Sequence, residues 1–267
     1  MLGKLMKYEL KATWKLLIPA NLFMVLMSIL AYMTVQLSFF DSDNYVVVMT
    51  GIIVIMTYIL SMFVIAVGTM IYLIYRFYKS VYGDEGYLLH TLPVDKHNII
   101  IAKAVISALW VSLSSILMYL SIILIMSTRL NVLKTMRRSF ETYMELVDSG
   151  RQVGGFTVFM TLITLFIALL ARILKITACI SLGQLSSNHK VLSAFGFYYG
   201  IYFVQRFFTF IYYMILMLVA ETSDERYQLS FLTLGTSWEF TLISSLIYCV
   251  VFYVLTWYIM DKKLNLE

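Results

Sequence analysis

Polar and apolar positions in this chain alternate on the scale of whole segments. Six stretches of about 20 residues or more carry no charge or almost none, and the charged residues gather between them. About 20 helical residues cross the hydrocarbon core of a bilayer, so each stretch is long enough to be one membrane span. The six predicted spans are 16–36, 45–75, 104–128, 153–171, 191–220 and 240–260.

The predicted spans are helices rather than strands. No segment shows the ten-residue apolar and polar alternation of a transmembrane strand, and backbone groups in lipid must pair within each segment. Composition agrees, because 61% of the 267 residues are hydrophobic and 13% are charged. A soluble domain is about 45 to 50% apolar and about 25% charged. We therefore expect an all-α polytopic membrane protein with one transmembrane domain over 1–267.

Basic residues lie unevenly on the two sides of this predicted bundle. If the N-terminus faces the cytoplasm, thirteen of the 20 lysines and arginines are inside, six are outside, and Arg206 lies within a span. This bias follows the positive-inside rule and predicts that both termini are cytoplasmic. Nucleic acid is not an expected partner, because the cations flank the spans and form no single basic face. The inner set is Lys4, Lys7, Lys11, Lys15, Arg76, Lys79, Lys96, Lys103, Arg172, Lys175, Lys190, Lys262 and Lys263.

Two segments outside the spans show helical amphipathicity. Residues 1–15 place their lysines on one face and their apolar residues on another, which predicts an interfacial elbow helix before the first span. A basic tail that only sets the topology is the alternative. In 129–152, apolar residues recur at spacings of three, four and seven. That pattern predicts an extracellular amphipathic helix on the outer leaflet. A substrate-exit element or a partner-binding surface is the other interpretation of this loop.

The segment 76–103 has the most informative loop sequence, RFYKSVYGDEGYLLHTLPVDKHNIIIAK. An acidic residue, a glycine, an apolar stretch, a Pro-aliphatic pair and a later lysine follow one another in it. They are Glu85, Gly86, Tyr87 to Leu89, Pro93 with Val94, and Lys103. In this order and position the segment resembles the loop between the second and third spans of type-2 ATP-binding-cassette exporter permeases. The N-terminal MLGKLMKYELKAT and the later SLGQLSSNHK also resemble small permeases of this class from Gram-positive bacteria.

The resemblance implies a permease subunit in a bacterial cytoplasmic membrane. It also implies a second permease copy or a homologous permease, and cytoplasmic ATPase subunits that bind ATP and Mg. No cofactor is expected on this chain. A short coupling helix between spans 2 and 3 would meet the ATPase through a set of seven residues. These are Asp84, Glu85, Gly86, Tyr87, Leu88, Leu89 and Pro93.

The glycine, proline and capping residues of 76–103 are compatible with a short coupling helix. Gly83 and Gly86 allow a tight bend, Pro93 ends a helix, and Asp95 or Asn98 can cap the next helix. A short helix between two such breaks can act as a lever. An ordinary solvated hairpin between two spans is the alternative.

Arg206 is expected near the middle of the fifth span, where insertion of a cation costs about 2.5 to 3.5 kcal/mol. A helical period places it on one face with tyrosines, opposite a face rich in Phe and Ile. Contact of Arg206 with a tyrosine ring would offset part of the cost. The polar-aromatic face either lines a pathway or dimer seam, or makes a structural bond to a neighbouring helix. Its members are Tyr198, Tyr199, Tyr202, Arg206, Thr209 and Tyr213.

Catalytic and metal-binding motifs are missing from the sequence. There is no G-x-x-x-x-G-K-[ST] phosphate loop, so ATP hydrolysis is expected in a partner, and no protease or hydrolase motif occurs. The three histidines, His97 among them, are expected in solvated loops without ligand spacing, and we expect no metal site or catalytic residue. A non-transporting sensor or immunity protein is the main alternative function, and a membrane-embedded enzyme is the weaker one.

Overall fold

The chain is all-helical throughout the residues that the structure, a computed structural model, describes. These are 2–37, 39–41, 43–83, 85–86, 95–127, 137, 141, 154–186, 189–221 and 235–262. Six long helices and one short 3-10 helix follow one another within them. They are α1 (Leu2–Gln36), η1 (Phe39–Asp41), α2 (Tyr45–Val81), α4 (Lys96–Met126), α6 (Gly154–Gly183), α7 (Lys190–Glu221) and α9 (Gly235–Lys262).

Five of these helices are long and apolar enough to cross a membrane. They are α1, α2, α4, the Phe159–Gly183 part of α6 and the Glu239–Lys262 part of α9. With 37 residues, α2 is about 55 Å long at 1.5 Å per residue, well beyond the roughly 30 Å of hydrocarbon. The prediction of a multi-pass helical membrane architecture is confirmed by these five helices. The expected fifth span corresponds to α7, a helix of 32 residues that carries Arg206.

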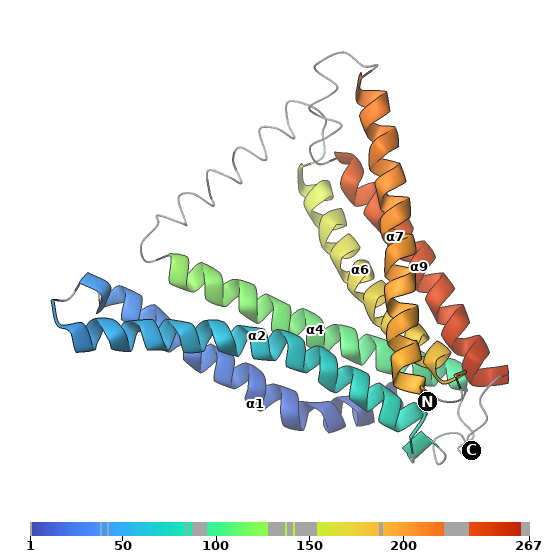
Figure 1. The fold of residues 1–267 in the computed structure, drawn as a ribbon, viewed down its shortest axis with the longest axis horizontal. Helices are drawn as coiled ribbons and strands as arrows, with labels where there is room; N and C mark the ends of the chain where they lie inside the picture. The colour runs from blue at the N-terminus through green and yellow to red at the C-terminus, as the bar shows by residue number, and fades with distance from the viewer. Residues whose placement is uncertain are drawn as a thin grey trace.

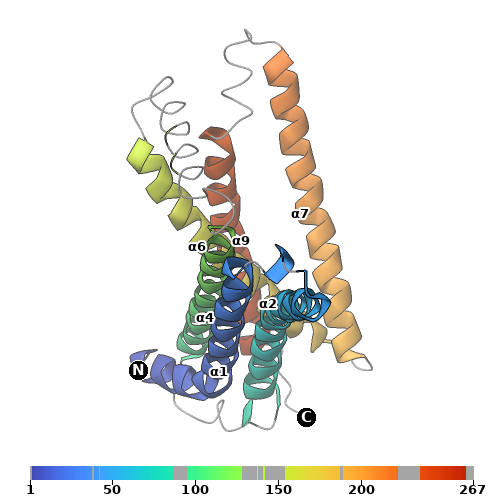
Figure 2. The ribbon, with the colours of Figure 1, turned by 90° about the vertical axis from the view of Figure 1, so that its left-hand side faces the viewer.

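The helices form two groups of three (Figure 1). One group holds α1, α2 and α4, the other holds α6, α7 and α9, and α4 joins them through contacts with α6 and α9. Successive helices run in opposite directions, so the start of α1 and the end of α9 lie at the same end of the molecule (Figures 1 and 2). We call this the terminal end. The two groups diverge away from it.

The apolar core lies where the two groups meet. Val81, Ile100, Ala108, Ala178 and Met260, from α2, α4, α6 and α9, are all at most 1% exposed. Beyond the core the helices expose large apolar side chains, including Phe63, Tyr119 and Phe203. An apolar surface spread over whole helices matches hydrocarbon surroundings rather than water.

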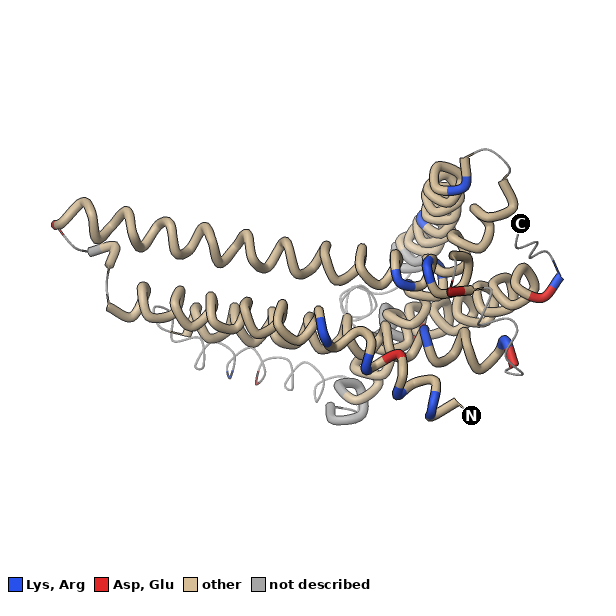
Figure 3. The backbone as a smooth tube through the Cα atoms, turned by 90° about the horizontal axis from the view of Figure 1, so that it is seen from below, with Lys and Arg blue, Asp and Glu red and all other residues tan. Residues whose placement is uncertain are grey.

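The predicted elbow segment is the beginning of α1 and not a separate helix. The helix is continuous from Leu2 to Gln36, although Pro19 lies inside it and cannot donate a backbone hydrogen bond. Its first turns run at an angle to the rest of α1 (Figure 2). Most of the charged residues that Figure 3 marks lie toward the terminal end, and the first turns of α1 carry several of the cations.

Most of the two predicted loop structures lies outside the described residues. In 129–152 only Arg137 and Glu141 are described, and their side chains form an exposed ion pair with 2.8 Å between Nε and Oε1. In the coupling segment, Asp84, Tyr87, Leu88, Leu89 and Pro93 lie outside the described residues, whereas Glu85 and Gly86 lie inside them.

Candidate functional site

A carboxylate on α1 joins α2 and α4 near the terminal end. Glu9 accepts hydrogen bonds from Arg76 Nε on α2 at 2.9 Å and from Lys103 Nζ on α4 at 2.5 Å, one on each carboxylate oxygen. Lys103 also donates to Ser80 Oγ at 2.6 Å. Arg76 and Lys103 lie on the two helices that flank the 84–94 segment. Glu9 therefore ties both flanks of that segment to the first helix.

These charges are largely removed from solvent. The side chains of Glu9, Lys103 and Arg76 are 17%, 7% and 24% exposed. Breaking a buried ion pair by removing one partner is strongly destabilising, because an unpaired charge is left behind. The cluster therefore holds three helices in one arrangement, and a shift of any of them must carry the others or break these pairs.

We call the contact of Glu9 with Arg76 and Lys103 the junction of α1, α2 and α4. Hydrogen bonds between neutral groups extend this junction along α1. Trp110 Nε1 on α4 donates to Thr13 Oγ1 at 2.7 Å, and Thr13 in turn donates to the carbonyls of Glu9 and Leu10. Tyr72 on α2 donates to the Ala12 carbonyl at 3.4 Å. The same stretch of α1 thus contacts both flanking helices through polar groups.

The described part of the predicted coupling segment begins with a tight turn. The Gly86 amide donates to the Gly83 carbonyl at 2.8 Å. A Cβ on Gly86 would lie 2.3 Å from the Val81 carbonyl oxygen, so no other residue fits without a shift of the backbone. Glu85 is exposed and forms a 3.4 Å ion pair with Lys79. Its carboxylate is available at the surface.

The end of α2 is fixed against the second group of helices by Tyr82. Its hydroxyl donates to Ser181 Oγ on α6 at 2.6 Å. Burial raises the pKa of Tyr82 to about 12, and the bond to Ser181 opposes part of that rise. The phenol therefore remains a neutral hydrogen-bond donor at physiological pH.

The start of α4 is fixed to α9 by a further set of contacts. Asp95 takes the N-cap position of α4 without a capping side-chain bond, and Lys96 pairs with Asp261 at 3.0 Å. The expectation of a loop position for His97 was wrong. This histidine lies in the first turn of α4, stacks on Trp257 and makes a 2.5 Å hydrogen bond with the Tyr253 hydroxyl. A helix that starts well before the apolar span gives His97 these partners.

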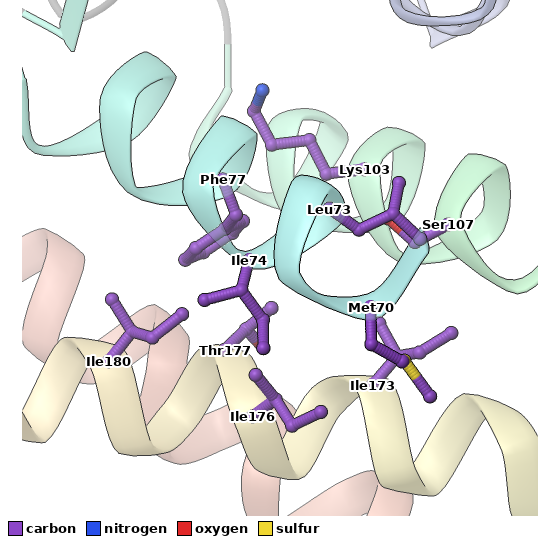
Figure 4. A pocket seen from close by; sticks show the side chains of 10 residues that line it. All are labelled: Met70, Leu73, Ile74, Phe77, Lys103, Ser107, Ile173, Ile176, Thr177 and Ile180. Carbon is purple, nitrogen blue, oxygen red and sulfur yellow. The ribbon is translucent and has the colours of Figure 1, made fainter. Parts of the chain in front are cut away.

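A pocket lies next to the junction, between α2, α4 and α6 and on the side of the junction that faces away from α1 (Figure 4). Its lining is apolar apart from Lys103, Ser107 and Thr177, and the Lys103 amine points away from the side chains of α6 (Figure 4). That amine is already bound to Glu9 and Ser80. The pocket therefore offers no free charge to a ligand. The remaining lining residues are Met70, Leu73, Ile74, Phe77, Ile173, Ile176 and Ile180.

The predicted seam residues on α7 are divided between two environments. Arg206 is exposed, and its Cζ lies 5.0 Å from the centre of the Tyr202 ring, the tyrosine contact expected for it. Tyr198 and Thr209 are half-buried, as is Ile201 from the opposite face rich in Phe and Ile, whereas Tyr199 and Tyr213 are exposed. The packed face of α7 is thus rotated by roughly 70° from the predicted polar-aromatic face, at 100° per residue.

Sequence reasoning missed the role of Glu9. One signal was available, because Glu9 is the sole acidic residue among the basic residues of 1–15. A single carboxylate beside so many lysines indicates a specific partner. Its partners are 67 and 94 positions away, and periodicity within one helix cannot identify them. Among the described residues no group of three or more His, Cys, Asp and Glu could hold a metal ion.

Comparison of the chain with family models, curated proteins and solved structures finds no match to any of the three.

Proposed function

We propose that this chain is the permease subunit of an ATP-binding-cassette exporter in a bacterial cytoplasmic membrane. It moves substrate across that membrane with ATP hydrolysed by a separate ATPase subunit. In this proposal α7 also crosses the membrane and brings the number of spans to six, both termini are cytoplasmic, and the first turns of α1 lie at the inner membrane surface. Three features support it: the resemblance of 76–103 to an ATPase-facing loop, the multi-pass helical architecture, and the position of the start of α1 and the end of α9 at the same end of the molecule.

The observation that carries the proposal is the attachment of both flanks of the 84–94 segment to α1. A force applied to that segment by a partner reaches α2 and α4 first. Glu9 binds Arg76 on α2 and Lys103 on α4, so α1 must move with them. Tyr82 and Lys96 connect the same flanks to α6 and α9. One cytoplasmic contact can thereby act on helices of both three-helix groups.

Partners follow from the same proposal. The ATPase binds ATP and Mg, this chain binds no cofactor, and a second permease copy or a homologous permease completes the pathway. Tyr199, Arg206 and Tyr213 are exposed on α7. In this proposal they line that pathway or the seam between permeases. A membrane protein of this type also contacts lipid over its exposed apolar surface.

Affinity purification of the full chain from its native membrane tests the proposal. We expect a protein with a phosphate loop to copurify in stoichiometric amount and to hydrolyse ATP. Glu85→Lys reverses an exposed charge in the segment and should uncouple ATP hydrolysis from export while insertion stays normal. Asp43→Lys changes an exposed carboxylate between η1 and α2, away from the terminal end, and should have no effect. A stable chain that purifies without any ATPase would contradict the exporter and favour a sensor or immunity protein.

A further inference from the structure

Three cations gather where α7 packs against α6. Lys175 on α6 donates from Nζ to Gln205 Oε1 on α7 at 3.1 Å. The same Nζ lies 4.8 Å and 5.6 Å from the ring centres of Tyr198 and Tyr202. Arg206 lies over the Tyr202 ring as well. The third cation, Arg172, precedes Lys175 by three positions and so shares its face of α6.

The positive charge of this cluster is not balanced by the described residues around it. Lys175 is 7% exposed, yet of its three N–H donors only the one to Gln205 has a hydrogen-bond acceptor among the described residues. None of the three cations forms a salt bridge with a described carboxylate, in contrast to Arg76 and Lys103, which share Glu9. The charges of Arg172 and Arg206 also repel that of Lys175. Tyrosine rings and one amide offset only part of this repulsion.

Arg172 and Lys175 lie just past the inner end of the predicted span 153–171, where such long side chains can reach lipid headgroups. Arg206, expected near the middle of its span, lies over the same Tyr202 ring as Lys175, so the packing of α7 on α6 brings it to the level of the other two cations. Arg172 and Arg206 are exposed, and α7 packs on α6 at the edge of the bundle, with a further contact between its Tyr212 ring and Phe240 of α9 (Figure 2). A lipid can therefore approach from the side. Intramembrane cations usually have a counter-charge, and basic sites between spans bind anionic headgroups.

We propose that Arg172, Lys175 and Arg206 bind the phosphate group of an anionic phospholipid between α6 and α7. The guanidinium groups of Arg172 and Arg206 donate paired hydrogen bonds to the phosphate oxygens, and the buried Lys175 ammonium adds a further positive charge beside them. The lipid then cancels the repulsion across the helix pair and holds α7 on the bundle. This site does not depend on the proposed exporter function, because it requires only the membrane and the packing of α7 on α6.

Lipid binding to the purified full chain in detergent tests the site. Binding is measured by native mass spectrometry, and stabilisation by thermal unfolding, with phosphatidylglycerol, with phosphatidylcholine and with inorganic phosphate. We expect tighter binding of phosphatidylglycerol than of phosphatidylcholine, and a loss of about fivefold in affinity for each cation removed in Arg172→Gln and Arg206→Gln. Lys190→Gln is the matched control, because it removes an exposed cation from the first turn of α7. Its affinity should equal that of the unchanged chain.

The outcomes separate the possible occupants. Stabilisation by inorganic phosphate that is lost in the arginine variants supports the site with free phosphate as its occupant. Equal binding of the two lipids by the unchanged chain overturns the proposal, and so does unchanged phosphatidylglycerol affinity in the double Arg172→Gln, Arg206→Gln variant. Both arginines are exposed, so this variant should fold even if Lys175→Gln does not. Lys175→Arg keeps the charge and should keep the lipid preference.

Discussion

Replacing Glu9 by Gln removes one charge and almost no volume from the junction of α1, α2 and α4. The unchanged carboxylate binds Arg76 at 2.9 Å and Lys103 at 2.5 Å. A Gln side chain has one acceptor oxygen in place of two and cannot neutralise either cation. The variant therefore leaves two positive charges facing each other in a largely buried place.

The expected loss follows from the exposure of the two cations. Removing one partner of a buried ion pair costs about 3 to 5 kcal/mol. Lys103 is 7% exposed and falls under that rule, whereas Arg76 at 24% can turn toward solvent or headgroups and adds less. We therefore expect a loss of about 3 kcal/mol, which lowers the melting temperature by roughly 5 to 10 °C. Glu85→Gln breaks the ion pair of Lys79 and Glu85, whose side chains are 51% and 57% exposed. This variant should therefore lose less than about 1 kcal/mol of stability.

Thermal unfolding of the purified variants in one detergent at neutral pH measures this difference. The double variant Glu9→Gln, Lys103→Met removes the second charge as well, and should be more stable than the sum of the single losses predicts. The reasoning about the junction would be refuted if Glu9→Gln melted with the unchanged protein in a correctly inserted chain. Strict additivity of the two single losses would refute it equally.

Three further changes test other contacts. Trp110→Phe removes the donor to Thr13 and should cost about 1 to 2 kcal/mol in thermal unfolding, whereas a cost near zero would show that this bond is unimportant. Gly183→Val should separate α7 from α6, because even a Cβ at this position would lie 2.6 Å from a side chain of α7. Gly196→Val is the control, since a Cβ there meets open space, and it should leave the two helices together. Cysteine crosslinking between α6 and α7 measures the difference. The neutral Tyr82 phenol has its pKa raised from 10.0 to about 12, so its contribution to stability is complete below pH 10 and lost as the pH rises toward 12. Tyr82→Phe should lack that loss, and identical pH profiles would contradict it.

The long helices could be predicted from sequence, because an uncharged run of some 20 residues has few alternatives to a span. Helix ends could not be placed as well. The predicted span 104–128 corresponds to α4, which begins at Lys96, since polar residues such as His97 extend the helix beyond the apolar run and find partners on α9. For the same reason, 1–15 continues into α1.

The site could be predicted less completely than the fold. The position of Arg206 within an apolar run indicated its cost, helical periodicity placed it on a face with tyrosines, and Tyr202 makes the expected ring contact. Periodicity could not identify the orientation of α7, because α7 has apolar or aromatic residues on every side and its contacts with α6 and with Phe240 of α9 decide which side is packed. Glu9 required knowledge of which helices lie together, and that depends on tertiary packing.

The most direct test of the proposed permease function is site-specific photo-crosslinking from Leu88 in the predicted coupling segment, performed in intact membranes. We expect a crosslink to a protein with a phosphate loop, weakened in Glu85→Lys and unaffected in Asp43→Lys. A probe at Arg137, in the predicted outer loop, should give no such product. Capture of the ATPase from Arg137 and not from Leu88 would contradict the account, because the 84–94 segment would then not be the part of the chain that meets the energy source.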